Sequence, residues 1–238
     1  MAVSVQPVQA ASEVVVISHS SFYSTSDILY IVGEVENTGD VATEFTKVTA
    51  TFYDAEDQVL DTKVGYATLD ILLPGRKSPF YVMMFEDDGS LDVDDYSLTV
   101  SWDDYEEGKE IGLEIISSDD QMDAVDWLHV TGEIKNIGTE TATEVIVCAT
   151  FYDSEGTVIG RDTEDVDPTT LSPEGIGTFD ITLIYPELIE QVASYSLTAE
   201  SENYALVPEF PILTTIFAAL AIVALTALVY RKKLQTQQ

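Results

Sequence analysis

Cysteine and histidine are almost absent from this chain of 238 residues, which contains only Cys148, His19 and His129. One thiol cannot form an internal disulfide, so the fold must be held by its hydrophobic core. Neither histidine belongs to a catalytic constellation or to a zinc-type ligand spacing, and there is no glycine-rich phosphate loop. We therefore expect a non-enzymatic protein without a cofactor, and a secreted hydrolase is the least favoured alternative.

Positive charge is also scarce. The 10 Lys and Arg stand against 43 Asp and Glu, which gives a formal net charge of -33. Such a surface repels phosphate, so nucleic acid is excluded as a partner. The excess charge fits an acidic coat that keeps an exposed protein soluble, or alternatively a surface that binds cations.

Long apolar runs are missing except at the C-terminal end. Residues 212–230 carry no charge, and the run stops at Arg231, Lys232 and Lys233. At about 1.5 Å per residue, a helix over this run is about 28 Å long, which matches the hydrocarbon thickness of a bilayer. Basic residues stay on the cytoplasmic side. We predict a single-pass transmembrane helix at 212–230, a cytoplasmic basic tail at 231–238, and an exterior location for the rest of the chain.

The exterior part repeats itself at an offset of 99 positions. Gly33–Gly39 aligns with Gly132–Gly138, and Ala50–Asp54 aligns with Ala149–Asp153, with no gap from residue 13 to residue 105. Equal loop lengths indicate two copies of one domain. The predicted organisation is an N-terminal segment at 1–12 that holds the remnant of an export signal, domain 1 at 13–103, a linker at 104–111, domain 2 at 112–202 and a second linker at 203–211.

Within each copy the apolar residues recur with a period of two. Val48, Ala50 and Phe52 alternate with polar residues, as expected of a half-buried strand. Cys148, the equivalent of Thr49, falls on the outward side of its strand. Strands are predicted near 13–18, 28–36, 45–54, 58–64, 78–86 and 95–102, and again 99 residues later. This density of short strands predicts an all-β fold of two tandem antiparallel β-sandwiches.

Two pairs of motifs have the composition of turns. Asn37-Thr-Gly39 and Asn136-Ile-Gly138 each end a strand where Asn can hydrogen-bond its own backbone and Gly can take a positive φ. Asp153-Ser-Glu-Gly156 has the pattern of a hairpin turn, and the equivalent segment 54–57 lacks the glycine. We expect structural roles for all of them.

An acidic loop in the first copy is the candidate metal site. Its carboxylates include Asp87, Asp88, Asp92, Asp94 and Asp95, and carboxylate oxygens are the ligands that Ca²⁺ prefers. The spacing does not match an EF-hand loop, and the second copy lacks the loop. A solvated acidic loop is therefore favoured over a Ca²⁺ site.

The strand at 78–86 has the most suggestive surface. Tyr81, Met83 and Phe85 occupy positions where the second copy has Asp180, Thr182 and Ile184. A strand that is apolar on both faces within an acidic shell implies that its second face is covered. Either the linker or the second copy covers it, or it is a partner surface or a homotypic contact.

These residues resemble known archaeal families. The Gly-Glu-Val-x-Asn-x-Gly motif at 33–39, the Ala-Thr-Phe-Tyr-Asp segment, and Leu-Leu-Pro-Gly at 72–75 with Phe80 are similar to FxLYD-type and CARDB-like immunoglobulin-like domains of archaeal surface proteins. Pro208, Glu209, Phe210 and Pro211 ahead of the apolar run resemble a PEF-type C-terminal sorting signal. The first resemblance implies immunoglobulin-like sandwiches, and the second implies handling by an archaeosortase-like enzyme.

Together these features predict a membrane-anchored cell-surface protein whose β-sandwich modules contact a protein or envelope partner. The alternative is an accessory subunit of a membrane or cell-envelope complex, with or without stabilisation by Ca²⁺.

Overall fold

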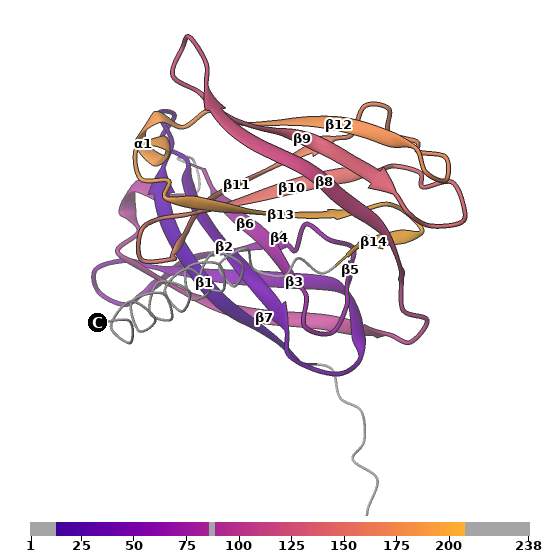
Figure 1. Ribbon diagram of the computed structural model, residues 1–238. Helices are drawn as coiled ribbons and strands as arrows, with labels where there is room; N and C mark the ends of the chain where they lie inside the picture. The colour runs from indigo at the N-terminus through magenta and orange to yellow at the C-terminus, as the bar shows by residue number, and fades with distance from the viewer. Residues whose placement is uncertain (1–12, 86–88, 208–238) are drawn as a thin grey trace, which may run out of the picture. The chain divides into compact units, whose positions relative to one another are not determined.

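The computed structural model describes residues 13–85 and 89–207, which belong to one compact unit, Met1–Val207. The described residues are mostly β, with sheets stacked as in a sandwich (Figure 1). Helical segments are short: η2 (Ser90–Asp92) is a 3-10 turn and α1 (Pro186–Ile189) is a single turn. The all-β prediction is thereby confirmed.

The N-terminal half of this unit, residues 13–105, contains two antiparallel sheets. One sheet has the order β1-β2-β6, formed by β1 (Val14–Tyr23), β2 (Leu29–Asn37) and β6 (Lys77–Met84). In the other sheet β3 (Ala42–Tyr53) pairs with β4 (Val59–Tyr66), β5 (Ile71–Leu72) and β7 (Asp95–Tyr105). Side chains from both sheets form one core that includes Ile31, Phe52, Leu72, Phe80 and Met84.

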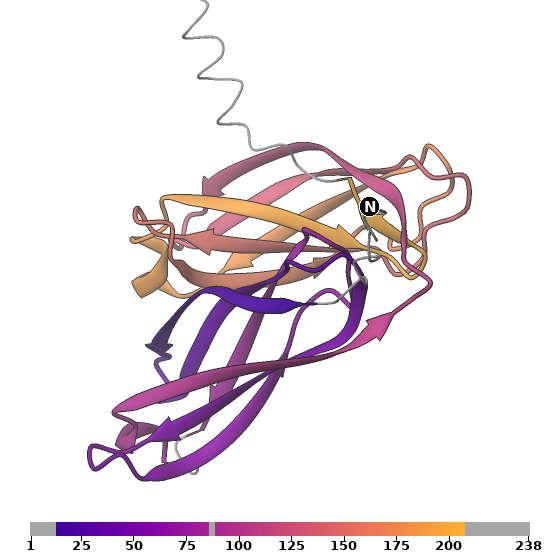
Figure 2. The ribbon, with the colours of Figure 1, turned by 90° about the horizontal axis from the view of Figure 1, so that it is seen from below.

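The C-terminal half, residues 110–207, repeats this arrangement. One layer contains β8 (Glu110–Met122), β9 (Leu128–Asn136) and β12 (Ile176–Leu183). The other contains β10 (Ile146–Tyr152), β11 (Val158–Asp165) and β13 (Ser194–Glu200). A short strand, β14 (Tyr204–Leu206), pairs with both β13 and β8 and joins the layers into one seven-stranded sheet. Figure 2 shows the layers of both halves from a second direction.

The strand pairings of the two halves follow the sequence offset. Val14 pairs with Asn37 in the first half, and Leu113 pairs with Asn136 in the second. The irregularity between Val16 and Ser18 recurs at the equivalent place in β8. The residues that align in sequence therefore occupy equivalent places in the sheets, so the halves can be compared position by position.

The Asn-x-Gly motifs are turns, as predicted, but one glycine is needed for a different reason. The Asn136 amide donates hydrogen bonds to the carbonyls of Glu140 and Leu171, and its Oδ1 accepts one from the Gly138 backbone. Gly138 does not adopt a positive φ; a Cβ there would lie 2.3 Å from the Tyr204 ring. The expectation of a positive φ is wrong at both Gly39 and Gly138, and Gly138 instead permits the close approach of a side chain.

The hairpin turns between β3 and β4 and between β10 and β11 have the same backbone form. Gly156 has a φ of 82°, and its equivalent Asp57 lies in the same left-handed region with a φ of 59°. In each turn an aspartate, Asp54 or Asp153, accepts two backbone N–H groups on its Oδ1. The missing glycine of the first copy therefore marks local strain and not a different turn.

Strand β14 differs from the sequence interpretation, which placed a linker at 203–211. Tyr204 and Leu206 are buried, and the Tyr204 hydroxyl accepts a hydrogen bond from the Glu140 backbone. The interpretation followed the polar residues at 201–203 and missed that the next three residues are all apolar and buried.

Several predicted segments lie outside the described residues: the N-terminal segment at 1–12, the Pro-Glu-Phe motif at 208–211, the membrane helix at 212–230 and the tail at 231–238. Within 13–85 and 89–207 no helix has the length and apolar character needed to span a bilayer.

Candidate binding groove between the two halves

The two halves contact each other through the outer face of the β1-β2-β6 sheet. Strand β11 lies against it, and the contact includes two backbone-to-side-chain hydrogen bonds from β1. The Val158 N–H donates to Ser18 Oγ at 2.9 Å, and the Ser20 hydroxyl donates to the Val158 carbonyl at 2.6 Å. These bonds fix β11 along the serines of β1.

Strand β2 is consequently buried on both faces. Val32 and Glu34 point away from the core of the N-terminal half, yet each is only 3% exposed. The Tyr152 hydroxyl donates to Glu34 Oε1 at 3.0 Å, and Lys77 Nζ lies 3.7 Å from Glu34 Oε2. Burial raises the pKa of Glu34, while the Lys77 charge and the Tyr152 hydrogen bond oppose that rise. The contact thus encloses a carboxylate that has partners from both halves.

Cys148 is buried by the same contact. It is only 1% exposed, although it does not belong to the core of the C-terminal half. Thr68 of the N-terminal half interacts with the thiol, and burial raises the pKa of Cys148 to about 11. The outward side predicted for this residue is correct with respect to its own sandwich, but that side is covered by the other half. The thiol is therefore a buried group with little thiolate at neutral pH.

A buried ion pair closes the contact near the connection between the halves. Lys109 Nζ lies 2.7 Å from Glu200 Oε2, and both side chains are buried. Glu200 Oε1 accepts a hydrogen bond from the Asp70 backbone N–H of the N-terminal half. Burial raises the pKa of Glu200 and Lys109 opposes the rise. Glu200 therefore joins the C-terminal half to both the connection and the N-terminal half.

The predicted partner face lies at the edge of this contact. Tyr81 and Met83 lie next to the C-terminal half, where the Arg161 guanidinium carbon is 4.3 Å from the centre of the Tyr81 ring. Of the two alternatives for this face, cover by the second copy applies to part of it. Tyr81 is still 36% exposed and Phe85 is 47% exposed.

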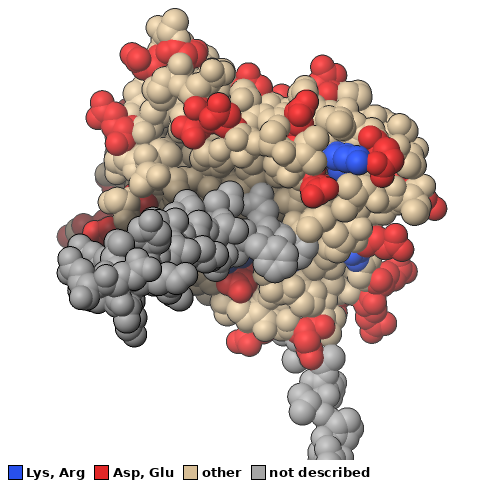
Figure 3. All heavy atoms as spheres, viewed as in Figure 1, with Lys and Arg blue, Asp and Glu red and all other residues tan. Residues whose placement is uncertain are grey.

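The uncovered part forms a groove with a cavity volume of about 610 Å³. We call it the apolar groove, and its larger apolar lining residues are Val64, Tyr66, Tyr81, Met83, Phe85 and Ile146. Figure 3 shows acidic side chains scattered over one face of the molecule, with Lys and Arg at few places. On a chain of formal net charge -33, a cluster of exposed apolar side chains is unusual and typical of an interaction surface.

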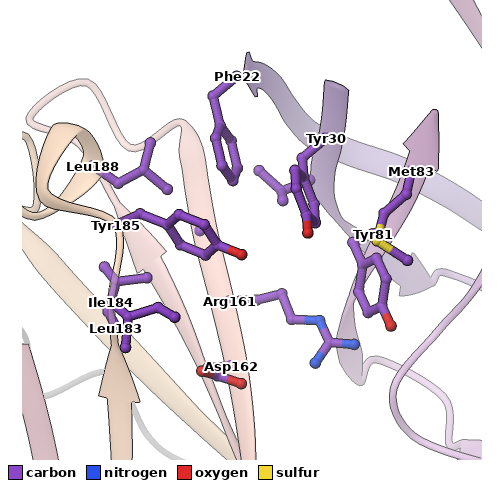
Figure 4. A pocket seen from close by; sticks show the side chains of 12 residues that line it. Phe22, Tyr30, Tyr81, Met83, Arg161, Asp162, Leu183, Ile184, Tyr185 and Leu188 are labelled. Atoms are coloured by element: carbon purple, nitrogen blue, oxygen red, sulfur yellow. The ribbon is translucent and has the colours of Figure 1, made fainter. Parts of the chain in front are cut away.

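A smaller pocket of about 240 Å³ adjoins the apolar groove and shares Tyr81, Met83 and Arg161 with it. We call it the aromatic pocket. Phe22 stacks on Tyr30 with ring centres 5.1 Å apart, and Tyr185 meets Phe22 edge to face at 5.2 Å. Figure 4 shows these rings and the Arg161 side chain around the same space. The pocket combines aromatic walls from both halves with one cation.

The candidate metal ligands are only partly described. Asp87 and Asp88 lie outside the described residues, while Asp92, Asp94 and Asp95 are exposed. Asp95 Oδ1 accepts a hydrogen bond from the Tyr96 backbone. Among the residues that the structure describes, no group of three or more His, Cys, Asp or Glu side chains could hold a metal ion. The described residues of this loop therefore do not form a metal site.

Sequence reasoning identified Tyr81, Met83 and Phe85 but missed the aromatic pocket. The available signal was the comparison of the copies, because the pocket residues have unlike equivalents. Phe22 corresponds to Gln121, Tyr30 to His129, Arg161 to Thr62 and Tyr185 to Glu86. Applied to every strand, the same comparison would have found them.

No protein family matches this sequence, and no curated protein is similar to it. Two solved structures show the level of structural likeness. Red sea bream transglutaminase is 8% identical with a TM-score of 0.26, and the match covers 84% of this chain and 30% of the enzyme. The exo-chitosanase CsxA of Amycolatopsis orientalis is 11% identical with a TM-score of 0.29, covering 79% of this chain and 26% of the enzyme. The chain thus spans less than a third of either enzyme, and such low scores carry no argument about its fold or activity.

Proposed function

We propose that this protein is a non-enzymatic, membrane-anchored cell-surface protein that recognises a protein or envelope partner through the apolar groove. Its two tandem domains, 13–103 and 112–202, are immunoglobulin-like, and the helix at 212–230 anchors them outside the cell. The observation that carries the recognition function is the groove itself, because exposed Tyr81 and Phe85 line one cavity together with other apolar side chains on a strongly acidic chain.

Recognition by a surface of this kind needs no bond chemistry. The rings supply apolar area with few rotatable bonds, and Met83 adapts to the shape of the partner. The acidic coat repels anionic surfaces and so limits unspecific contacts to other parts of the molecule. Recognition is therefore expected to centre on the groove.

Membrane anchoring is tested by cell fractionation of the full-length chain and of a chain that ends at Val207. The full-length chain should sediment with membranes and be digested by protease added to intact cells, because its domains lie outside. The chain ending at Val207 should be released. Recovery of the full-length chain in the soluble cytoplasmic fraction would contradict the proposed location.

Recognition through the groove is tested by site-specific photo-crosslinking in intact cells. A photoreactive residue replaces Phe85, which is 47% exposed, and in the matched control it replaces Ile176, which is 48% exposed and lies on β12. We expect a discrete crosslinked product from position 85 and none from position 176. Equal labelling at both positions would show that the groove has no special role.

The alternative, an accessory subunit of an envelope complex, is favoured by the mixed character of the groove, in which Lys63, Thr68 and Arg161 adjoin the apolar side chains. A stable complex of fixed composition that copurifies with the crosslinked product would support it. A PEF-type signal further implies that an archaeosortase-like enzyme removes the helix, which mass spectrometry of the native C-terminus would detect as a chain ending near Pro208.

A further inference from the structure

We propose that the aromatic pocket binds a carboxylate carried on a flat apolar body, with Arg161 as its counter-charge. This inference rests on the proposed recognition function, because it names the chemical group that the partner offers next to the apolar groove. The pocket volume of about 240 Å³ is below the roughly 300 to 1,000 Å³ of pockets for drug-sized ligands. It therefore suits one ring or side chain and not a large ligand.

Arg161 shows which charge the ligand must carry. One of its terminal nitrogens, Nη1, donates to Thr163 Oγ1 at 2.9 Å. Its Nε is buried and has no hydrogen-bond partner among the residues that the structure describes. An unpartnered buried donor is costly, and a carboxylate can accept two parallel N–H groups from one edge of a guanidinium. Because this Nε is not exposed to solvent in the structure, binding through this edge requires the Arg161 side chain to rotate toward the pocket.

Two tyrosine hydroxyls supply further donors. Tyr30 comes from β2, Tyr185 follows β12, and the two hydroxyls are hydrogen-bonded to each other. One of the two O–H groups donates in that bond, so the other is left to donate to a ligand. Figure 4 shows the Tyr185 hydroxyl pointing toward the Arg161 side chain, whose guanidinium lies beside the Tyr81 ring. The tyrosine hydroxyls and Arg161 therefore line one pocket that could supply donors to an anionic group.

Asp162 also lines the pocket and must be weighed, because a carboxylate there could favour a cationic ligand. Its Oδ1 already accepts a hydrogen bond from the Thr163 backbone at 2.8 Å, and burial raises its pKa. Arg161 lowers the pKa of Asp162 in opposition to burial, but its Nε still lacks a hydrogen-bond partner among the described residues. The rings of Phe22, Tyr30 and Tyr185 then provide apolar walls for the body of the ligand.

The test observes Arg161 directly. The chain has three arginines, Arg76, Arg161 and Arg231, so the Nε–H region of a ¹⁵N NMR spectrum should contain three signals. Arg161→Lys identifies the Arg161 signal by its loss. The full-length chain in detergent micelles is titrated with phenylacetate and with N-acetyl-phenylalanine, which separates a free aromatic acid from the C-terminal residue of a peptide. The corresponding amides are the matched controls.

We expect at least one of the two acids to shift the Arg161 signal while the Arg76 signal stays in place, and the amides to leave both unchanged. Arg161→Met should weaken binding of the acid roughly tenfold or more, as the loss of a charge-assisted hydrogen bond predicts. Tyr185→Phe keeps the ring and should weaken it roughly threefold to tenfold. Arg161→Lys keeps the charge without the planar edge, so it remains informative if Arg161→Met does not fold.

Equal shifts with acids and amides, or no shift with either acid, would overturn the inference. The crosslinking at position 85 reports on the proposed function separately. A crosslink from that position without a response of Arg161 would refute the carboxylate pocket alone. Binding of an acid without any crosslink would support the pocket and contradict recognition through the apolar groove.

Discussion

The outer faces of two equivalent sheets, β1-β2-β6 and β8-β9-β12, differ in what covers them. The strands pair in the same register, so the backbones offer the same surface. In the first sheet the other half covers the face, and in the second no part of the chain at 13–85 or 89–207 covers it to the same extent, since Asp180 is exposed. The equivalent positions are Tyr30 and His129, Val32 and Thr131, Tyr81 and Asp180, and Met83 and Thr182. The side chains of the two faces therefore differ according to whether the other half packs on the face, although the backbones are equivalent.

The contact between the halves joins two different surfaces of the repeated domain, the outer face of one sheet and the edge strand β11. The β1-β2-β6 sheet of one half meets β11 of the other, so the equivalent faces, the outer side of β8-β9-β12 and the strand β4, do not make this contact within the described residues. A contact of this head-to-tail kind can continue into a filament if the open faces remain complementary. Polar residues such as Thr131, Asp180 and Thr182 remove that complementarity. The sequence differences between the two copies thus allow the contact on the first sheet and prevent a further copy from packing on the second.

The largest expected effect comes from the ion pair at the contact. Lys109→Met leaves the Glu200 carboxylate buried without its cation, and we expect the free energy of unfolding to fall by about 3 to 5 kcal/mol. The matched control is Lys135→Met on the open sheet, where Lys135 pairs with the exposed Glu174 and the loss should stay below about 1 kcal/mol. Urea unfolding measures both. Similar losses for the two variants would remove the distinction between the covered and open regions.

A smaller effect is expected from a charge placed on each face. Val32→Asp puts a carboxylate into the contact, where Val32 is buried, and should cost about 2 to 3 kcal/mol. Thr131→Asp introduces the same charge at the equivalent position of the open sheet and should change stability by less than about 0.5 kcal/mol. Thermal unfolding of both variants gives the comparison. If Val32→Asp is as mild as Thr131→Asp, the face is not covered.

The two hairpin turns offer a test of the strain that separates the copies. Gly156→Asp brings into the C-terminal half the side chain that Asp57 already has, and should cost about 1 kcal/mol because φ stays positive. Asp57→Gly should stabilise by about 0.5 kcal/mol, since the freedom of glycine in the unfolded chain offsets part of the relief. Chemical unfolding measures both changes. The changes in the free energy of unfolding of the two variants should have opposite signs. A loss of stability in Asp57→Gly as well as in Gly156→Asp would show that the aspartate is favoured in the turn of the first copy.

The smallest effect concerns His129, which the open face has in place of Tyr30. The hydrogen bond to Asp180, with the Asp123 carboxylate nearby, raises the pKa of His129. The protonated form is thus favoured in the folded protein. Its contribution is fully present below the unfolded pKa of about 6.5 and is lost as pH rises through the higher folded pKa. We expect a few tenths of a kcal/mol, because the pair lies near the surface.

A pH series of melting temperatures for the parent chain and for His129→Gln measures this contribution. The parent should lose a small stabilisation relative to the variant between pH 6 and pH 8. A difference that grows with pH over this range would contradict the raised pKa.

The sequence was sufficient where a pattern lies within one copy. The alternation at Val48, Ala50 and Phe52 located β3, and the Asp-Ser-Glu-Gly segment located the turn before β11. It was insufficient where two distant segments meet. Gly138 is required by the Tyr204 ring, and β14 depends on pairing with β8, and neither relation is expressed by local spacing.

The candidate site shows the same division. Tyr81, Met83 and Phe85 were found because the second copy provided a reference for the outer face of one strand. The aromatic pocket was missed because Phe22, Tyr30 and Tyr185 belong to three separate segments that only the contact brings together. Periodicity assigns a side chain to a face but does not say what lies against that face.

Reaction of Cys148 with a thiol reagent tests the contact most directly, because the native chain has this one cysteine and the contact buries it. In native protein at pH 8 we predict essentially no reaction, and full labelling only after unfolding. A Thr49→Cys variant in a Cys148→Ser background places a thiol at the equivalent position of the N-terminal half, where Thr49 is only partly buried, and should react faster than Cys148 does in the native chain. Rapid labelling of Cys148 in the folded parent chain would contradict the packing of the two halves and the groove that depends on it.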